Sequence, residues 1–221
     1  MDGRRTRWDA HRRTRRTELV EATLRAIRHH GAGVGMDEIA ASAGTSKTVL
    51  YRHFGDRSEL YLAVTEAVHA LILHDLRATL DAASAGDTGP GRPGTSPRAT
   101  IAAVLDAYLH LVEADPEVYR FVVTRPLLDR PVAEDPNTGL VTLIGDQVAG
   151  VLAANGYPAG IAASWGHGLV GMVRAAADHW ITTVDRPPRA ELVAQLTDLA
   201  WRGLAGSPAP DPGRHRPEEI P

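Results

Sequence analysis

One segment of 23 residues constrains the fold more than any other part of the chain. It runs from Glu38 to Leu60 with the sequence EIAASAGTSKTVLYRHFGDRSEL. Ile39, Ala40 and Ala43 share one face of a short helix at about residues 36–43, and the small alanines allow a second helix to approach closely. Gly44 follows, and glycine readily adopts the left-handed backbone conformation that a tight turn needs. The segment therefore predicts a short helix that ends in a tight turn.

A second short helix is expected over residues 47–53. Ser46 is suited to cap it, and Val49, Leu50 and Phe54 are spaced to anchor it inward. Two such helices form a helix-turn-helix, whose second helix enters the major groove in proteins that use the motif to bind DNA. The polar side chains left on its other faces, with a cation at the start of the next helix, are the candidates for contact with base edges and phosphates: Ser46, Lys47, Thr48, Tyr51, Arg52, His53 and Arg57.

This segment resembles the DNA-binding domain of TetR-type transcriptional repressors, the TetR/AcrR family. Their pattern is a helix ending in glycine, an Ile-Ala pair, Ala-Gly, Ser, Leu-Tyr-x-His-Phe, and a basic residue before Leu. Over about residues 13–60 the chain supplies, in order, Gly31, Ile39-Ala40, Ala43-Gly44, Ser46, Leu50-Tyr51, His53-Phe54, Arg57 and Leu60. Gly35 departs from the pattern, because the family commonly has Thr or Ser there as a helix cap. Beyond residue 60 only the all-α layout is similar.

The resemblance implies a homodimer in which each N-terminal unit places its second short helix in one half-site of a palindromic operator on double-stranded DNA. It also implies a C-terminal domain with a small-molecule pocket and the dimer interface, and release from DNA by a small-molecule effector. Repression is the commoner role in the family. By matched position, Lys47 and Arg52 are our candidates for base readout, Tyr51 and His53 for backbone contact, and Arg57 for phosphate contact.

Helical patterning along the whole chain predicts an all-α fold of about nine helices. Besides the two short ones, we expect helices at about 11–30, 57–83, 98–114, 116–124, 136–155, 158–184 and 188–205. The expected organisation is a flexible Arg-rich arm at 1–10, a helix-turn-helix domain at 11–56 and a ligand-binding and dimerisation domain at 57–206. Within the last domain, the Gly- and Pro-rich residues 84–97 predict a flexible loop, and residues 207–221 predict a disordered tail.

Charge is distributed unevenly along the chain. Residues 1–60 carry twelve basic and eight acidic side chains, whereas residues 61–221 carry twelve basic and nineteen acidic ones. A basic N-terminal part favours an interaction with nucleic acid. Seven arginines lie within the first sixteen residues: Arg4, Arg5, Arg7, Arg12, Arg13, Arg15 and Arg16. They are suited to follow phosphates or to enter the minor groove, and equally to form a solubilising tail, and the sequence leaves these alternatives open.

The last two long helices contain the candidates for a dimer interface. Between residues 161 and 180, large apolar residues recur every three or four positions among glycines and alanines, which suggests a close helix approach. The resemblance implies that these helices pair with those of a second chain as a four-helix bundle, and ordinary packing within one chain is the alternative. The candidates are Trp165, Leu169, Met172, Val173, Trp180, Leu192, Leu196 and Leu199.

The middle helices contain the candidates for an effector pocket. A mostly apolar cavity with a few polar groups suits a lipophilic effector. The aromatic and polar candidates are Tyr108, His110, Phe121, Arg125, Trp165, His167 and Arg174. Core packing or a surface position is the alternative for each of them.

Several function classes are disfavoured. The chain has no cysteine, which excludes disulfides, thiolate metal sites and a cysteine nucleophile. The histidines lack metal-ligand spacing, and the one GxGxxG, at residues 166–171, lies inside a helical stretch, so we expect no metal and no cofactor. The uncharged run at 147–173 is broken at 155–158, and no signal peptide is apparent, so we expect a cytoplasmic protein without membrane association. The alternatives to a regulator are a helical small-molecule binding protein or enzyme whose motif does not bind DNA, and a protein-interaction module.

Overall fold

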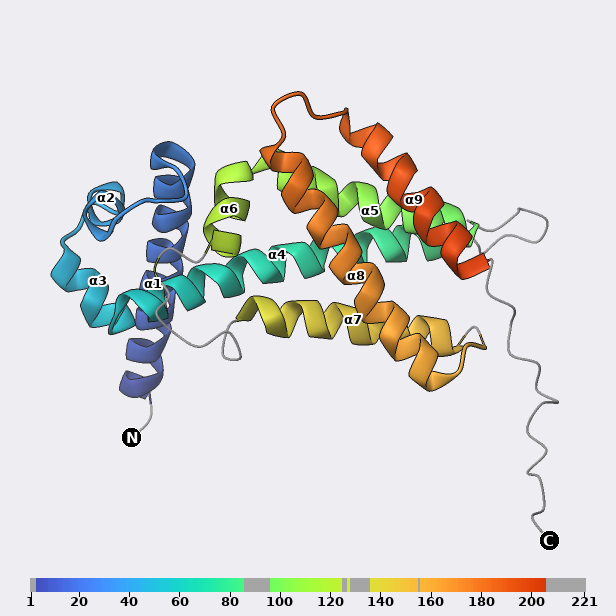
Figure 1. Ribbon diagram of the computed structural model, residues 1–221. Helices are drawn as coiled ribbons and strands as arrows, with labels where there is room; N and C mark the ends of the chain where they lie inside the picture. Colours follow the sequence, from blue (N-terminus) through green and yellow to red (C-terminus); the bar gives the residue numbers. More distant parts are fainter. Residues whose placement is uncertain (1–2, 86–95, 125–126, 128–135, 155, 206–221) are drawn as a thin grey trace, which may run out of the picture. The chain divides into compact units, whose positions relative to one another are not determined.

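The computed structural model describes residues 3–85, 96–124, 127, 136–154 and 156–205. The backbone of these residues forms nine α-helices and no strand (Figure 1), which confirms the all-α class. The helices are α1 (Gly3–His30), α2 (Met36–Ser42), α3 (Lys47–Phe54), α4 (Arg57–Ala85), α5 (Pro97–Ala114), α6 (Pro116–Thr124), α7 (Pro136–Ala154), α8 (Ala159–Thr182) and α9 (Arg189–Ala205).

The helix bounds follow the expected ones closely, except at the start of α1. This helix begins at Gly3, so the backbone of residues 3–10 is helical where we expected a flexible arm. Arginine is a good helix former. Once the later part of a helix is formed, each residue added at its start gains one backbone hydrogen bond. Most of the expected loop at 84–97 and all of the expected tail at 207–221 lie outside the described residues.

The chain forms two compact units. Unit 1 comprises Met1–Arg77 and Leu111–Thr138, and unit 2 comprises Ala78–His110 and Gly139–Pro221. The boundary that we expected at residue 56 does not coincide with these units, because most of α4, up to Arg77, and the whole of α6 group with the helix-turn-helix. The division by function, with DNA binding before residue 57 and ligand binding after it, stays a prediction.

A continuous apolar core in unit 1 holds the helix-turn-helix to α4 and α6. Its wholly buried side chains include Leu19 and Ile27 of α1, Ile39 of α2 and Leu50 of α3. From α4 and α6 come two aromatic rings, those of Tyr61 and Phe121, whose centroids lie 5.7 Å apart. The Tyr61 hydroxyl donates to the carbonyl of Val122 at 2.8 Å, so its polar end is satisfied inside the core.

Two polar links join the start of α6 to the end of α1. The Arg28 guanidinium binds both carboxylate oxygens of Asp115, with Nε 2.9 Å from each, and this carboxylate raises the pKa of Arg28. The Glu117 carboxylate accepts the backbone N–H of Ala32 at 2.9 Å. Gly31, which ends α1 in a left-handed conformation, was expected to stop this helix and does so.

Unit 2 is built from antiparallel helix pairs. Arg98 near the start of α5 pairs with Asp198 of α9, and Arg189 near the start of α9 pairs with Asp106 of α5. This is the pattern of two antiparallel helices. Helices α7 and α8 meet at glycine. A Cβ atom placed on Gly166 would lie only 2.5 Å from the carbonyl oxygen of Gly145.

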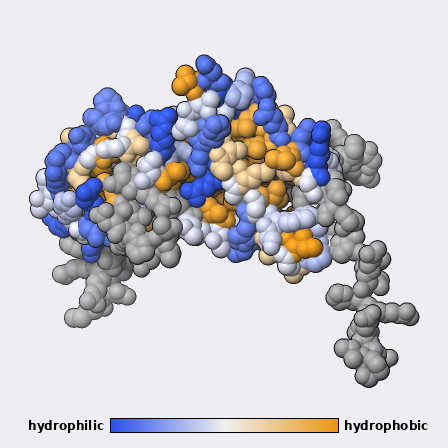
Figure 2. Space-filling model, in the orientation of Figure 1, coloured by the Kyte–Doolittle hydropathy of each residue, from blue (hydrophilic) through white to orange (hydrophobic). Residues whose placement is uncertain are grey.

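The close approach expected from the glycines of α8 is thus confirmed at Gly166. At Gly168 and Gly171 a Cβ atom would meet nothing within 4 Å, and both residues are exposed. These two glycines therefore do not serve packing within the described part of the chain. Figure 2 shows apolar side chains gathered on the face of unit 2 over α8 and α9. No described helix is long and apolar enough to cross a membrane.

Candidate nucleic-acid interface

The turn between α2 and α3 forms by the local features that the sequence indicates. Gly44 has a φ of +59°, and the N–H of Thr45 donates back to the carbonyl of Ala40 at 3.0 Å. Leu50 and Phe54 are buried and Val49 is half-buried, so the inward face of α3 is the predicted one. The polar side of α3 is thereby turned away from the core of unit 1.

The helix caps differ in part from expectation. Ser46 is the N-cap residue of α3 with an extended backbone, but its hydroxyl makes no capping hydrogen bond, so the expected side-chain cap is wrong. The helix begins instead with the Ser46 carbonyl, which accepts the N–H groups of Val49 and Leu50. Gly35 is the N-cap of α2, and its N–H donates to the carboxylate of Glu38 at 3.1 Å. Glycine therefore serves at the position where the family commonly has Thr or Ser.

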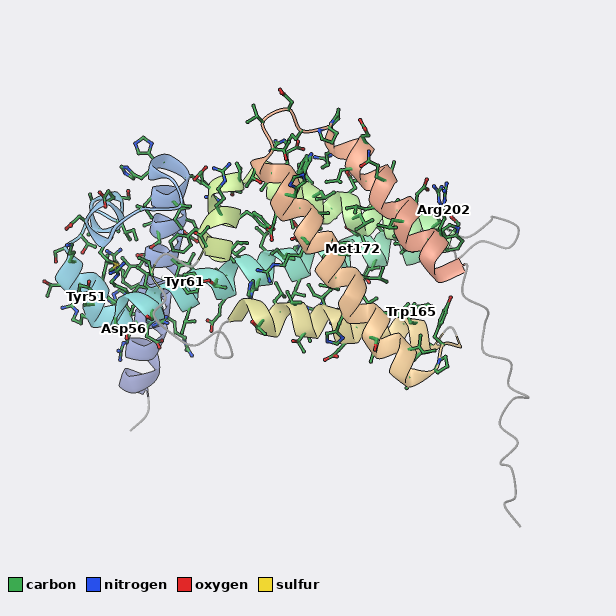
Figure 3. All side chains as sticks on the ribbon, in the orientation of Figure 1. Tyr51, Asp56, Tyr61, Trp165, Met172 and Arg202 are labelled. Carbon is green, nitrogen blue, oxygen red and sulfur yellow. The ribbon has the colours of Figure 1, made fainter. Side chains whose placement is uncertain are left out.

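All seven predicted contact residues lie together on α3 and at the start of α4. Six of them are exposed, and His53 is half-buried. Figure 3 labels Tyr51 on α3 and Asp56 just before α4. With eight residues, α3 is about 12 Å long, which is about the width of the DNA major groove.

Lys47 already has a partner in the DNA-free protein. Its Nζ lies 2.7 Å from Oδ2 of Asp37 at the start of α2, and this hydrogen bond is the main cause of a raised Lys47 pKa. Both side chains are exposed, so the pair adds little to stability. Asp37 therefore competes with a DNA acceptor for the Lys47 ammonium group. Asp37 could not be found from the sequence as a partner of Lys47, because the pair joins two helices across the turn.

Arg52 and Arg57 are differently placed. Within the described residues neither has an ion pair or a hydrogen bond from its side chain. The N-terminus of α4 is occupied, because the N–H of Glu59 donates to Oδ1 of Asp56 at 2.8 Å. One N–H of this helix end is thus already taken by a carboxylate, and the Arg57 guanidinium is left for a phosphate contact.

His53, at the end of α3, lies among arginines. Its Nδ1 is buried and has no hydrogen-bond partner, and its carbonyl accepts Nη1 of Arg16 at 3.1 Å. Burial is the largest cause that lowers the pKa of His53, followed by the positive charges of Arg52, Arg12, Arg15 and Arg16. The imidazole is therefore held neutral to lower pH than an ordinary histidine.

This arrangement predicts a pH dependence of stability. Because the pKa of His53 is below 6.5 in the fold and near 6.5 in the unfolded chain, the unfolded state binds the proton more readily. The free energy of unfolding should therefore fall as the pH drops below 6.5 and stay level above it. His53→Gln should reduce this loss, measured by urea unfolding at pH 7.5 and 5.5. An equal loss in both proteins would contradict the prediction.

The described pocket candidates are divided between the two units. Phe121 lies in the core of unit 1 and Arg125 lies outside the described residues, whereas the other five belong to unit 2. Among these, Nδ1 of the exposed His110 lies 2.9 Å from Nη1 of Arg189, and the Trp165 ring lies 5.4 Å from that of Tyr157. The remaining three, on α5 and α8, are half-buried: Tyr108, His167 and Arg174. Their role in a pocket stays a prediction.

The dimer candidates divide into covered and open side chains. Trp180, Leu192 and Leu196 are buried by their own chain, and the Trp180 indole N–H donates to the carbonyl of Pro187 at 2.7 Å. Four others on α8 are half-buried: Trp165, Leu169, Met172 and Val173. Leu199 is 59% exposed. The three covered residues thus offer little surface to a second chain, and the interface itself stays a prediction.

The described residues contain no cluster of three or more side chains able to hold a metal ion. What they present is a short helix with exposed hydrogen-bonding and basic groups, seated on a helix-turn-helix. Such a surface matches the acceptors on base edges and phosphates. The fold and this site define a helix-turn-helix protein of the DNA-binding class.

Known proteins identify the family. Residues 19–64 match the model of the bacterial regulatory proteins of the tetR family, and residues 91–214 match that of the tetracyclin repressor-like C-terminal domain. The HTH-type transcriptional regulator Rv0472c of Mycobacterium tuberculosis is 33% identical over 207 residues, which cover 93% of this chain and 83% of that protein. The HTH-type transcriptional activator FasR of Mycolicibacterium smegmatis is 30% identical, with 88% and 84% covered.

Solved structures agree in fold. A TetR-like regulator from Rhodococcus sp. RHA1 has a TM-score of 0.60 and 23% identity, covering 87% of this chain and 97% of its own. LfrR from Mycobacterium smegmatis, solved in complex with proflavine, has a TM-score of 0.53 and 21% identity, with 86% and 95% covered. The chain belongs to the TetR family of transcriptional regulators, as the resemblance implied, and this is a family of regulators rather than enzymes.

Proposed function

We propose that the protein is a repressor that binds a palindromic operator as a homodimer and is released by a small-molecule effector. The observation that carries the DNA-binding part is the exposed polar face of α3, with Thr48, Tyr51 and Arg52 open to solvent. Repression needs only that the bound protein occupies the DNA. The relative FasR is named an activator, so the sign of regulation requires its own measurement.

We propose that the dimer forms through α8 and α9. The exposed glycines Gly168 and Gly171 allow a partner helix to come close, and Ile161 and Leu199 add exposed apolar surface at 42% and 59%. A symmetric dimer would space its two α3 helices by about one turn of DNA, roughly 34–36 Å. Sedimentation at micromolar concentration should give the dimer mass, and a monomer would contradict the proposal.

We propose that α4 and α6 transmit the effect of the ligand. Helix α4 continues from unit 1 into unit 2, and α6 holds the end of α1 through Asp115 and Glu117. A small molecule bound by the C-terminal domain shifts the balance between the DNA-binding conformation and the released conformation only as far as its affinity for the two differs. The structural neighbour LfrR binds proflavine, which supports a small-molecule effector, and we propose a lipophilic one.

The function is tested by a gel shift with the DNA just upstream of the gene of this protein. We expect sequence-selective binding, with the operator bound at least a hundredfold more tightly than a scrambled duplex of the same length. A titration over a range of salt is needed, because phosphate contacts weaken as salt increases. No binding at any salt, or equal binding to both duplexes, would contradict the proposal.

Lys47→Ala and Arg52→Ala should each weaken operator binding by about 1–3 kcal/mol, which is roughly 5- to 150-fold. Both residues are placed to meet base edges, so the loss should be larger on the operator than on scrambled DNA. Arg202→Ala, an exposed arginine on α9, is the matched control and should leave both affinities unchanged. Equal losses on the two duplexes would instead assign Lys47 and Arg52 to phosphate contact.

A further inference from the structure

The stripe of α1 that faces the core changes character beside the end of α3. At Ile27, Thr23 and Leu19, spaced four residues apart, this stripe is apolar or uncharged and buried. The next positions along the same stripe, three and then four residues further toward the N-terminus, are Arg16 and Arg12. The inward side of α1 therefore becomes basic at the point where it passes the last turn of α3.

Arg16 fixes this basic stretch against α3. Its Nη1 donates to the carbonyl of His53 at 3.1 Å, and its guanidinium lies 4.5 Å from the centroid of the Phe54 ring. Arg12, one helical turn away, is exposed and has no ion pair or side-chain hydrogen bond within the described part of the chain. Arg16 thus ties this stretch of α1 to the end of α3, while the charge of Arg12 stays open to a ligand.

The surroundings carry a net positive charge. Arg12, Arg15, Arg16 and Arg52 all lie close enough to His53 to lower its pKa. The described carboxylate paired within this group is that of Glu18, 2.7 Å from Arg15. Nδ1 of His53 is buried in the same place without a hydrogen-bond partner. Four guanidinium groups against one carboxylate make a surface that favours an anion.

The geometry of a groove-bound helix identifies the anion. In helix-turn-helix proteins the first residues of the recognition helix contact base edges inside the major groove. The helix is about as long as this groove is wide, about 12 Å, so its last turn lies near the phosphates that border the groove. Arg12 and Arg16 are four residues apart, about 6 Å along α1, which is close to the axial rise of two nucleotide steps on one strand, at about 3.4 Å each.

We propose that Arg12, Arg15, Arg16 and His53 form one phosphate-binding surface, which holds the DNA backbone beside the groove that α3 enters. The proposal rests on the function proposed above and adds α1 to α3 and the start of α4 as a DNA-contacting element. It also selects between the alternatives that the sequence left open. A helix does not fit the minor groove, which is about 6 Å wide, and a segment anchored by Arg16 is not a loose solubilising tail.

The test is the salt dependence of DNA binding by Arg12→Ala in the full-length protein. Arg12 is chosen because no described contact ties it to the fold. Arg25→Ala is the matched control, since Arg25 is exposed on the same helix and is not among the charges that act on His53. Affinities of both variants and of the wild type are measured by fluorescence anisotropy on operator and scrambled duplexes at several salt concentrations.

We expect Arg12→Ala to reduce the slope of log K against log salt by about 1.8, because the proposed dimer loses one phosphate contact in each half-site, with a roughly 60-fold loss of affinity near 0.1 M salt. The loss should be equal on both duplexes, because a phosphate contact carries no sequence information. Arg25→Ala should behave as the wild type. A slope unchanged by Arg12→Ala, or a loss confined to the operator, overturns the proposal. Failure of the proposed function has a different signature, namely a wild type with no preference for any duplex.

Discussion

Phe121→Ala is expected to lower the free energy of unfolding by about 3–5 kcal/mol, the largest effect of any substitution considered for this protein. The ring is fully buried and lies against Tyr61, in the core that also holds α3. Removing it leaves a cavity that neighbouring helices close only in part. Because the same core positions the recognition helix, DNA binding should be lost at temperatures where the wild type still binds.

Urea unfolding of the wild type and of Phe121→Ala measures this loss. Phe121→Met is the matched control, because methionine fills most of the space and should cost less than about 1.5 kcal/mol. The sequence left both a pocket role and core packing open for Phe121, and the two roles give opposite results. A pocket residue would leave stability nearly unchanged and alter the response to the effector, so a loss below about 1 kcal/mol would contradict the core assignment.

Gly166→Ala is expected to cost about 3 kcal/mol, at the upper end of what overpacking usually costs. A Cβ atom at this position would lie 2.5 Å from the carbonyl oxygen of Gly145 and 2.7 Å from the backbone nitrogen of Ala149. Both neighbours are backbone atoms, which cannot rotate away as a side chain does. Helices α7 and α8 would have to separate, which outweighs the gain of up to about 1 kcal/mol from replacing a helical glycine.

The chain offers a control of the same chemistry. Gly150 lies on α7, and a Cβ atom there would meet nothing within 4 Å. Gly150→Ala should therefore stabilise the protein by about 0.5–1 kcal/mol, because alanine favours the helix and displaces nothing. Thermal unfolding of both variants separates the two cases. A change of the same sign in Gly166→Ala and Gly150→Ala would show that α7 and α8 are not in close contact at Gly166.

The sequence predicted the features that depend on the spacing of residues close together along the chain. Helix bounds follow from apolar periodicity and from glycine and proline, and the turn at Gly44 follows from its left-handed backbone. The inward face of α3 was predictable for the same reason, since Leu50 and Phe54 are four residues apart. These features depend on neighbours within one or two helical turns.

Features that depend on distant residues were not predictable. The link between Arg28 and Asp115 joins residues 87 positions apart, and Tyr61 packs on a ring 60 positions away. An apolar residue at helical spacing packs equally well within its own chain or against a second chain. Leu196 and Leu199 illustrate this, because both were expected at an interface, yet the first is buried in its own chain and the second is 59% exposed.

Cross-linking from single positions tests most directly whether α3 is the element that reads DNA. A photo-reactive amino acid replaces Thr48, exposed on α3, or Val184, 95% exposed in unit 2. Both variants are first checked for operator binding by gel shift and then irradiated on the operator duplex. We predict a covalent protein–DNA product from position 48 and none from position 184. No product from position 48 in a protein that binds the operator, or equal products from both positions, would contradict the assignment of α3 as the recognition helix.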